Sequence, residues 1–266
     1  KSDPLTLSLN IDDVQLYPNK SLQHVNGVMA FDGWVWHQGK VKSGQSENKL
    51  LDMSLVSKEG KRFLYISSND AGRILQTFDY YDNLSGGKLS LRGEYDGMWP
   101  ESKFSGRARI DDFRVINAPV LAELLNVASI TGILENLGGV GIAFAKLDAP
   151  FESIDDIITI KNASVSGLSL GLTAAGTFDT TVNTVDLKGT IVPAYALNTA
   201  LTRIPIIGSL LSGGEKDGGV FAANYTMTGS VKEPKISTNP LSVLAPGFLR
   251  SLFKIFDGPA DKATNN

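Results

Sequence analysis

The stretch LTLSLNI, residues 5–11, alternates apolar and polar side chains at every position. Side chains of a β-strand point alternately to opposite faces, so this spacing predicts a strand with one apolar and one polar face. One apolar, buried face and one polar, solvent-exposed face are typical of antiparallel sheets built from hairpins. The same alternation recurs at Leu51, Met53, Leu55; Phe63, Tyr65; Leu89, Leu91, Tyr95; Phe104, Ala108, Ile110; Leu168, Leu170, Leu172, Phe178; Val185, Leu187, Ile191; and Phe221, Tyr225, Met227.

Short turn signals rich in Asp and Gly separate these runs. They are Asp12-Asp13, Asp32-Gly33, Ser85-Gly86-Gly87, Asp96-Gly97, Asp111-Asp112, Asp155-Asp156 and Asp179-Thr180. Their positions predict strands of about five to ten residues joined by tight turns.

Segments of the C-terminal half break the strand rhythm and predict helices. The first covers 118–137, where Pro119 suits a first helical turn and Gly138-Gly139 suits a stop. A second is expected over 194–211 and a third over 246–256, and 257–266 are expected to form a disordered tail.

Composition narrows the possible functions of the 266-residue chain. A net charge of −3 lacks the basic footprint of nucleic-acid binding. With no Cys and two His, the chain cannot use thiol catalysis or Cys-ligated zinc and has little for a His-based metal site. We therefore expect no metal site and no nucleic-acid partner, and most enzyme chemistries are improbable. Because the sequence starts at Lys1 without a leader, any targeting segment is expected outside it.

The motifs that resemble catalytic sites have simpler explanations. Gly167-Leu168-Ser169-Leu170-Gly171 matches the G-x-S-x-G elbow, but it is expected inside a strand, with no helix and no His after it. His24 and His37 have no acidic or Cys companions, so they are interpreted as ordinary surface or half-buried residues.

The apolar strand faces could form either the core of a sandwich or the lining of a groove. In a sandwich, two sheets bury each other, whereas a long sheet rolled along its length would line a groove with its dry face. Such a groove could hold acyl chains, because burying a sixteen-carbon chain is worth about 12 kcal/mol at about 0.8 kcal/mol per methylene. Periodicity alone does not separate these alternatives.

The segment 246–256 has an amphipathic helical pattern. Its apolar side chains could enter a lipid interface, while Arg250 and Lys254 share one face and suit anionic headgroups. A helix that caps the open end of the sheet would show the same spacing.

The later part of the chain contains an ordered series of Pro, Gly and Asn signatures. The series comprises Asn117-Ala118-Pro119-Val120-Leu121, the run from Leu187 to Asn198, Ile204-Pro205-Ile206-Ile207-Gly208, Tyr225 to Gly229, Pro234, Asn239-Pro240-Leu241-Ser242 and Pro246-Gly247-Phe248-Leu249-Arg250. This series resembles the C-terminal region of AsmA-like proteins of the YhdP type. The similarity covers about residues 60 to 256, where Asn69-Asp70-Ala71-Gly72-Arg73 and Gly86-Gly87 also fit.

The resemblance implies a Gram-negative periplasmic protein, anchored in the inner membrane when complete and related to TamB and the bridge-like lipid transfer proteins. The implied fold is a long twisted antiparallel sheet curled into a taco-like apolar groove, with a few helices in the C-terminal half. Residues 1–117 would be a sheet segment of that groove and 118–256 the AsmA-like C-terminal region. The implied function is that of a phospholipid-binding terminal module in a bridge that moves phospholipid between the membranes and supports outer-membrane homeostasis. The resemblance also implies that the chain is no enzyme and needs no cofactor.

Residue roles follow from this implied fold as hypotheses. The lipid groove would be lined by Leu168, Leu170, Leu172, Leu187, Ile191, Phe221, Tyr225 and Met227. A gating helix would carry Leu121, Leu124, Leu125, Ile130 and Leu134. A helix contacting the outer membrane or a protein partner would carry Phe248, Leu249, Arg250, Leu252, Phe253, Lys254 and Phe256.

Other classes of function stay open at this point. One is a non-transporting envelope scaffold for outer-membrane assembly that binds protein partners, its apolar faces filled by side chains. Another is a hydrolase that uses Ser169, which requires an exposed hydroxyl near His24 or His37.

Overall fold

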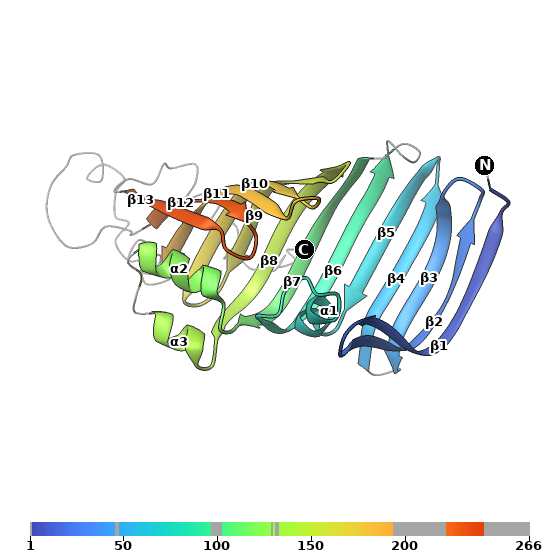
Figure 1. Cartoon of the computed structure of the whole chain (residues 1–266), viewed down its shortest axis with the longest axis horizontal. Coiled ribbons are helices and arrows are strands. Elements are labelled where there is room, and N and C mark those ends of the chain that lie inside the picture. The colour runs from blue at the N-terminus through green and yellow to red at the C-terminus, as the bar shows by residue number, and fades with distance from the viewer. Residues whose placement is uncertain are drawn as a thin grey trace, which may run out of the picture.

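A single antiparallel sheet of thirteen strands dominates the computed structural model, which describes residues 2–45, 48–96, 103–128, 130, 133–193 and 222–241. Spatial order follows chain order from β1 to β13, so β1 and β13 form the two edges (Figure 1). This confirms a mainly β chain with a long antiparallel sheet and few helices. Among the described strands, β1 and β13 each pair with a single neighbour and do not pair with each other.

Every neighbouring pair of strands runs antiparallel, as expected for consecutive hairpins. The strands are β1 Leu5–Tyr17, β2 Lys20–Phe31, β3 Trp36–Gln45, β4 Asn48–Lys58, β5 Lys61–Ser68, β6 Leu84–Asp96, β7 Lys103–Val115, β8 Ile142–Ile154, β9 Ile157–Ser166, β10 Leu170–Asp179, β11 Thr184–Pro193, β12 Ala222–Ser230 and β13 Lys235–Leu241.

The two ends of the strands differ in what connects them. At one end, here called the hairpin rim, short turns join β2 to β3, β4 to β5, β8 to β9, β10 to β11 and β12 to β13. At the opposite end, the helix rim, lie α1 (Ala71–Thr77), α2 (Pro119–Val127) and α3 (Leu134–Gly138). Figure 1 shows α1 and α3 beside the lower ends of the strands.

The predicted turns were only partly correct. Asp32-Gly33, Asp155-Asp156 and Asp179-Thr180 do lie at hairpin turns, and Asp96 ends β6. The other predicted turns were wrong, because Asp12-Asp13, Ser85-Gly86-Gly87 and Asp111-Asp112 lie inside β1, β6 and β7. Gly86, Gly87 and Asp112 have φ of 66°, 87° and 55°. A strand absorbs such left-handed residues as local irregularities that bend and twist it, without reversing its direction.

Buried side chains form two cores on one face of the sheet. The larger core joins the helices α2 and α3 to strands from β6 to β12, and the smaller core joins α1 to β2, β3 and β4. The larger core contains Leu84, Ile110, Phe113, Val115, Leu124, Leu125, Ile130, Ile133, Leu137, Ile142, Phe144, Leu170, Ile191, Ala223 and Tyr225. Both cores therefore fill the helix-rim side of this face.

Helix α1 was not predicted. Its N-terminus is capped by Asp70, whose Oδ1 accepts a hydrogen bond from the Arg73 amide at 3.0 Å, which is the signal that identifies its start. The β1–β2 turn is fastened beside this helix, because the Lys20 ammonium donates to Asp79 and, at 3.2 Å, to Asp82. That hydrogen bond from Lys20 is the main cause that lowers the pKa of Asp79.

The single helix expected over 118–137 was wrong, since α2 and α3 are separate helices. Pro119 does occupy the first turn of α2, as predicted. Helix α2 ends at Val127, with Ala128 as its C-cap, and the Ile130 amide donates to the Leu125 carbonyl at 2.8 Å, a bond typical of a chain leaving a helix. Gly132 and the β-branched Thr131 also have low helix propensity, which disfavours continuation. The helices expected over 194–211 and 246–256 and the tail over 257–266 lie outside the described residues.

Candidate functional site

One row of directly opposed residues crosses all thirteen strands and is almost entirely apolar or Gly. We call it the apolar row, and the face that carries it the apolar face. The row is Leu7, Met29, Gly39, Leu55, Leu64, Gly93, Gly106, Phe151, Ile160, Gly176, Leu187, Met227 and Ile236. Its large side chains are mostly half-buried, although Leu7 is 41% exposed and Leu55 is buried. At about 4.8 Å per strand, the row is about 58 Å long.

A second row of the same face lies two residues nearer the helix rim. From β1 to β8 it consists of Leu9, Gly27, Val41, Met53, Ile66, Leu91, Ala108 and Ala149. No charged side chain occurs in this row or in the apolar row. Because the sheet is the only one in the described chain, no second sheet covers these side chains there.

Aromatic rings lie against glycines on the apolar face. A Cβ added at Gly93 would lie 2.2 Å from the Phe104 ring, and one added at Gly106 would lie 2.9 Å from the Phe151 ring. Both glycines face the ring from the neighbouring strand, and the two rings are tilted with centroids 5.6 Å apart. The glycines therefore allow these rings to lie flat against the sheet, so this part of the apolar face is comparatively smooth.

The opposite face carries a polar row across β1 to β12. It consists of Asn10, Asn26, Lys42, Asp52, Ser67, Ser90, Arg109, Asp148, Ser164, Thr173, Thr190 and Asn224. Arg109 Nε lies 3.4 Å from Asp148, and Glu152 on the same face accepts hydrogen bonds from Lys161 and Lys103 that lower its pKa. The sheet thus has one charged and one apolar face along its length.

The residues predicted to line a groove occupy different environments. Leu170 and Ile191 are fully buried in the larger core, and Tyr225 is 6% exposed there. Leu172, Leu187 and Met227 are half-buried on the apolar face, and Phe221 lies outside the described residues. Leu187 and Met227 are therefore the members of the predicted set in the apolar row.

The placement of Leu168 on the apolar face was wrong. Gly167, Leu168 and Ser169 form the turn between β9 and β10, closed by the Gly167 amide donating to the Leu170 carbonyl at 2.9 Å. Leu168 is consequently 92% exposed. The strand begins at Leu170, so alternation counted from Leu168 crossed a turn.

The predicted gating residues are part of the packed interior. Leu124, Leu125 and Ile130 are buried in the larger core, and Leu121 and Leu134 pack against it. Thr238 Oγ1 on β13 donates to the Val127 carbonyl at 3.0 Å and fastens α2 to the far edge of the sheet. These helices cover the helix-rim end of the apolar face. The predicted membrane-contact residues from Phe248 to Phe256 lie outside the described residues.

Tyr225 is the titratable group of the predicted set, and its burial raises its pKa to about 12. Its hydroxyl donates to the Thr173 carbonyl at 2.8 Å. The folded state favours the neutral phenol of Tyr225. Burying this neutral phenol therefore contributes fully to the free energy of unfolding below the unfolded pKa of about 10, and the contribution is lost as pH rises towards 12.

We expect ultraviolet titration to show a tyrosine that ionises only near pH 12, together with a fall in the melting temperature between about pH 10 and 12. The late-ionising component should be absent in Tyr225→Phe. A wild-type spectrum in which every tyrosine ionises near pH 10 would contradict this placement.

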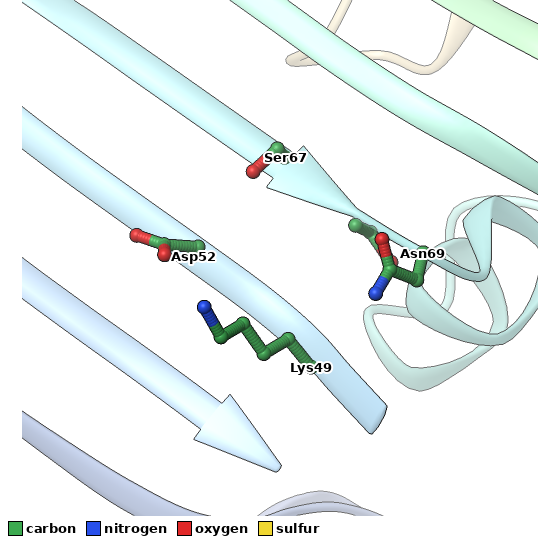
Figure 2. Close-up of a pocket in the computed structure, with 5 residues that line it drawn as sticks. Lys49, Asp52, Ser67 and Asn69 are labelled. Carbon is green, nitrogen blue, oxygen red and sulfur yellow. The ribbon is translucent and has the colours of Figure 1, made fainter. Parts of the chain in front are cut away.

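A shallow polar hollow of about 300 Å³ lies on the sheet near the ends of β4 and β5 (Figure 2). Its lining residues are Lys49, Asp52, Ser67, Ser68 and Asn69. Asp52 is already paired with Lys42 at 3.5 Å. The part of the chain that the structure describes contains no group of three or more His, Cys, Asp or Glu able to hold a metal.

Ser169 has no histidine beside it. Its turn joins the ninth and tenth strands, whereas His24 and His37 lie on the second and third. Several strand spacings of about 4.8 Å separate them, which is far beyond the hydrogen-bond reach that a serine nucleophile and its base need. The described geometry therefore gives the hydrolase hypothesis no support.

Comparisons with known proteins found no matching family model, curated protein or solved structure. Among the described helices, none has both the length and the apolar character needed to cross a bilayer.

Sequence reasoning missed part of the apolar face. Leu64, Gly93, Gly106, Phe151 and Ile160 belong to the apolar row but were not assigned to a site. Their adjacency depends on register between strands, which alternation within one strand does not reveal.

Proposed function

We propose that this chain binds phospholipid by laying acyl chains along the apolar row. The observation that carries the proposal is a half-exposed apolar row that crosses all thirteen strands beside a charged opposite face. Monomeric soluble proteins rarely leave a continuous apolar surface of this extent without a binding role.

Acyl chains suit this surface better than a small polar ligand does. The apolar row and the second row contain no charged group, so an acyl chain held there needs few polar contacts. Burial of a sixteen-carbon chain would supply about 12 kcal/mol before the cost of ordering it. Right-handed sheet twist and the α2 contact with β13 support a curved surface, and we propose that it forms a taco-like groove.

We further propose that the chain is a terminal module of an AsmA-like protein in the periplasm of a Gram-negative bacterium, anchored in the inner membrane when complete. In this role it would move phospholipid between the inner and outer membranes, without enzymatic activity or cofactor. The sequence signatures, the consecutive hairpins and the two-faced sheet support this assignment.

An envelope scaffold that binds a protein partner is the alternative, and the edge strand β1 favours it. This strand is 13 residues long and carries the exposed Leu5, Leu7 and Ile11, and β2 is its only partner among the described strands. A long exposed edge strand can pair with a strand of another chain.

The test is lipid extraction and mass spectrometry on protein purified without detergent. We expect phospholipid at near-stoichiometric amount in the wild type. Ile160→Asp and Leu187→Asp should reduce it at least about tenfold, since placing a charge against hydrocarbon costs more than about 1.4 kcal/mol.

Thr159→Asp and Lys188→Asp are the matched controls, because these neighbours point to the polar face. Both should retain lipid, and thermal unfolding should confirm that all four variants are folded. A folded wild type without lipid, or equal loss in variants and controls, would reject the groove and favour the scaffold.

A further inference from the structure

Arg62 occupies a singular position on the apolar face. It belongs to the row two residues nearer the hairpin rim than the apolar row, here called the rim row. From β4 to β12 this row is Ser57, Arg62, Tyr95, Phe104, Ser153, Ile158, Phe178, Val185 and Gly229. Arg62 is the one charged side chain in the rim row, the apolar row and the second row as given above.

The Arg62 guanidinium is held in place and most of its donors are free of protein acceptors in the described chain. Its Cζ lies 4.7 Å from the centroid of the Tyr95 ring, and its Nη1 donates to the Trp36 carbonyl at a long 3.4 Å. No carboxylate lies within ion-pair distance of Arg62 among the described residues. A guanidinium has five N–H donors, so it can still bind an acceptor with two oxygens.

The Glu94 carboxylate on the neighbouring strand β6 lies on the opposite face of the sheet from Arg62. Glu94 pairs with Lys61 on the polar face, one residue from Arg62 in β5. Ser57, directly opposite Arg62, donates its hydroxyl to the His37 carbonyl at 2.6 Å. A positive charge is thus left at the border of an uncharged apolar surface.

The aromatic neighbours place this charge at a polar-to-apolar boundary. Tyr95 stacks on Phe104 with centroids 4.4 Å apart, and Phe104 contacts Phe151 of the apolar row. Along β5, Leu64 follows Arg62 by two residues on the same face, about 7 Å away. Tyr and Arg beside an apolar surface are suited to the headgroup level of a lipid, with acyl chains beyond them.

We propose that Arg62 binds the phosphate of a phospholipid whose acyl chains lie on the apolar row. This inference rests on the proposed function and adds an orientation of the bound lipid, with its headgroup towards the hairpin rim and its acyl chains towards Leu64. The planar guanidinium matches two phosphate oxygens, a geometry that an ammonium group does not reproduce. Free phosphate shares the same chemistry, so the test separates the two sources.

The test is calorimetric titration of the whole chain with short-chain phosphatidylglycerol below its micelle concentration, with diacylglycerol of the same chains, and with inorganic phosphate. Arg62→Gln should weaken phosphatidylglycerol binding about tenfold or more and leave diacylglycerol binding within about twofold. Arg62→Lys should keep part of the affinity, because lysine keeps the positive charge but lacks the planar guanidinium that matches two phosphate oxygens. Arg92→Gln is the matched control, since Arg92 is exposed on the polar face of β6, opposite Tyr65.

Each result bears on a different part of the proposal. Equal loss of both lipids in Arg62→Gln, or no loss of either, would overturn the phosphate site while lipid binding by the wild type would stand. Inorganic phosphate binding as tightly as phosphatidylglycerol would overturn the lipid assignment. A wild type that binds neither lipid would overturn the proposed function together with this inference. Thermal unfolding of each variant verifies the fold.

Discussion

Replacing Leu170 with Ala is expected to lower the free energy of unfolding by about 2 to 5 kcal/mol, because the truncation leaves a cavity in a packed core. Leu170 has 0% exposure and belongs to the larger core together with Leu124 and Leu125. Urea denaturation followed by circular dichroism measures the change.

Leu168→Ala is the matched control, two residues away on the same chain. Leu168 is 92% exposed in the β9–β10 turn, so this substitution should change the free energy of unfolding by no more than about 0.5 kcal/mol. Similar values for the two variants would mean that Leu168 and Leu170 share one environment, as strand alternation suggested, and would contradict the observed turn.

Gly189→Ala is expected to be the second large perturbation. A Cβ added at Gly189 would lie 1.8 Å from the Thr173 carbonyl oxygen and 2.7 Å from the Tyr225 ring. Since a backbone atom cannot rotate away, the strands must separate, and overpacking of this kind costs about 1 to 3 kcal/mol or more. Urea denaturation should report the loss, and the raised pKa of Tyr225 should fall as water reaches its ring.

Gly138→Ala provides a contrast, because a Cβ at this end of α3 meets nothing within 4 Å. Helical Ala is favoured over Gly, so this variant should be neutral or more stable by about 0.4 to 1 kcal/mol. If Gly189→Ala were as well tolerated as Gly138→Ala, the close approach of β10, β11 and β12 at Gly189 would be wrong.

Alternation of side chains predicted the fold class because each strand shows an apolar and a polar face. It did not distinguish a turn from an irregularity inside a strand. Asp111-Asp112 and Asp155-Asp156 look alike in sequence, yet the first pair lies within β7 and the second joins β8 to β9. Asp112 and Asp155 both have positive φ, at 55° and 52°. The pairing of the flanking residues with neighbouring strands decides between these outcomes, and that information is not local.

Local sequence also predicted the helices incompletely. Pro119 marked the start of α2, but the continuous apolar pattern to Leu137 concealed the break after Ala128, because both short helices bury their apolar sides in one core. Helix α1 has only 7 residues, too few for a periodic pattern, and Asp70 was its only clear local signal.

The candidate site required register between strands. Leu187 and Met227 were selected from alternation and proved to be neighbours in the apolar row. The alternation at Phe63 and Tyr65 predicted that Arg62 lies on the polar face, and the register of β5 shows that this was wrong. The significance of Arg62 depends on Tyr95 and Leu64 lying on the same face, which only the pairing of β5 with β4 and β6 reveals.

In the proposed function, acyl chains contact the apolar face and not the polar face. The most direct test places a photo-crosslinking amino acid singly at Leu64, Ile160 and Leu187, and at their chain neighbours Tyr65, Thr159 and Lys188, and exposes each purified protein to phospholipid before irradiation. Mass spectrometry then counts lipid adducts at each position.

We predict adducts at Leu64, Ile160 and Leu187 and few or none at the three neighbours, because alternate residues of a strand face opposite sides of the sheet. Adducts at both members of each pair, or at none of the six positions in folded protein, would contradict an acyl-binding apolar face.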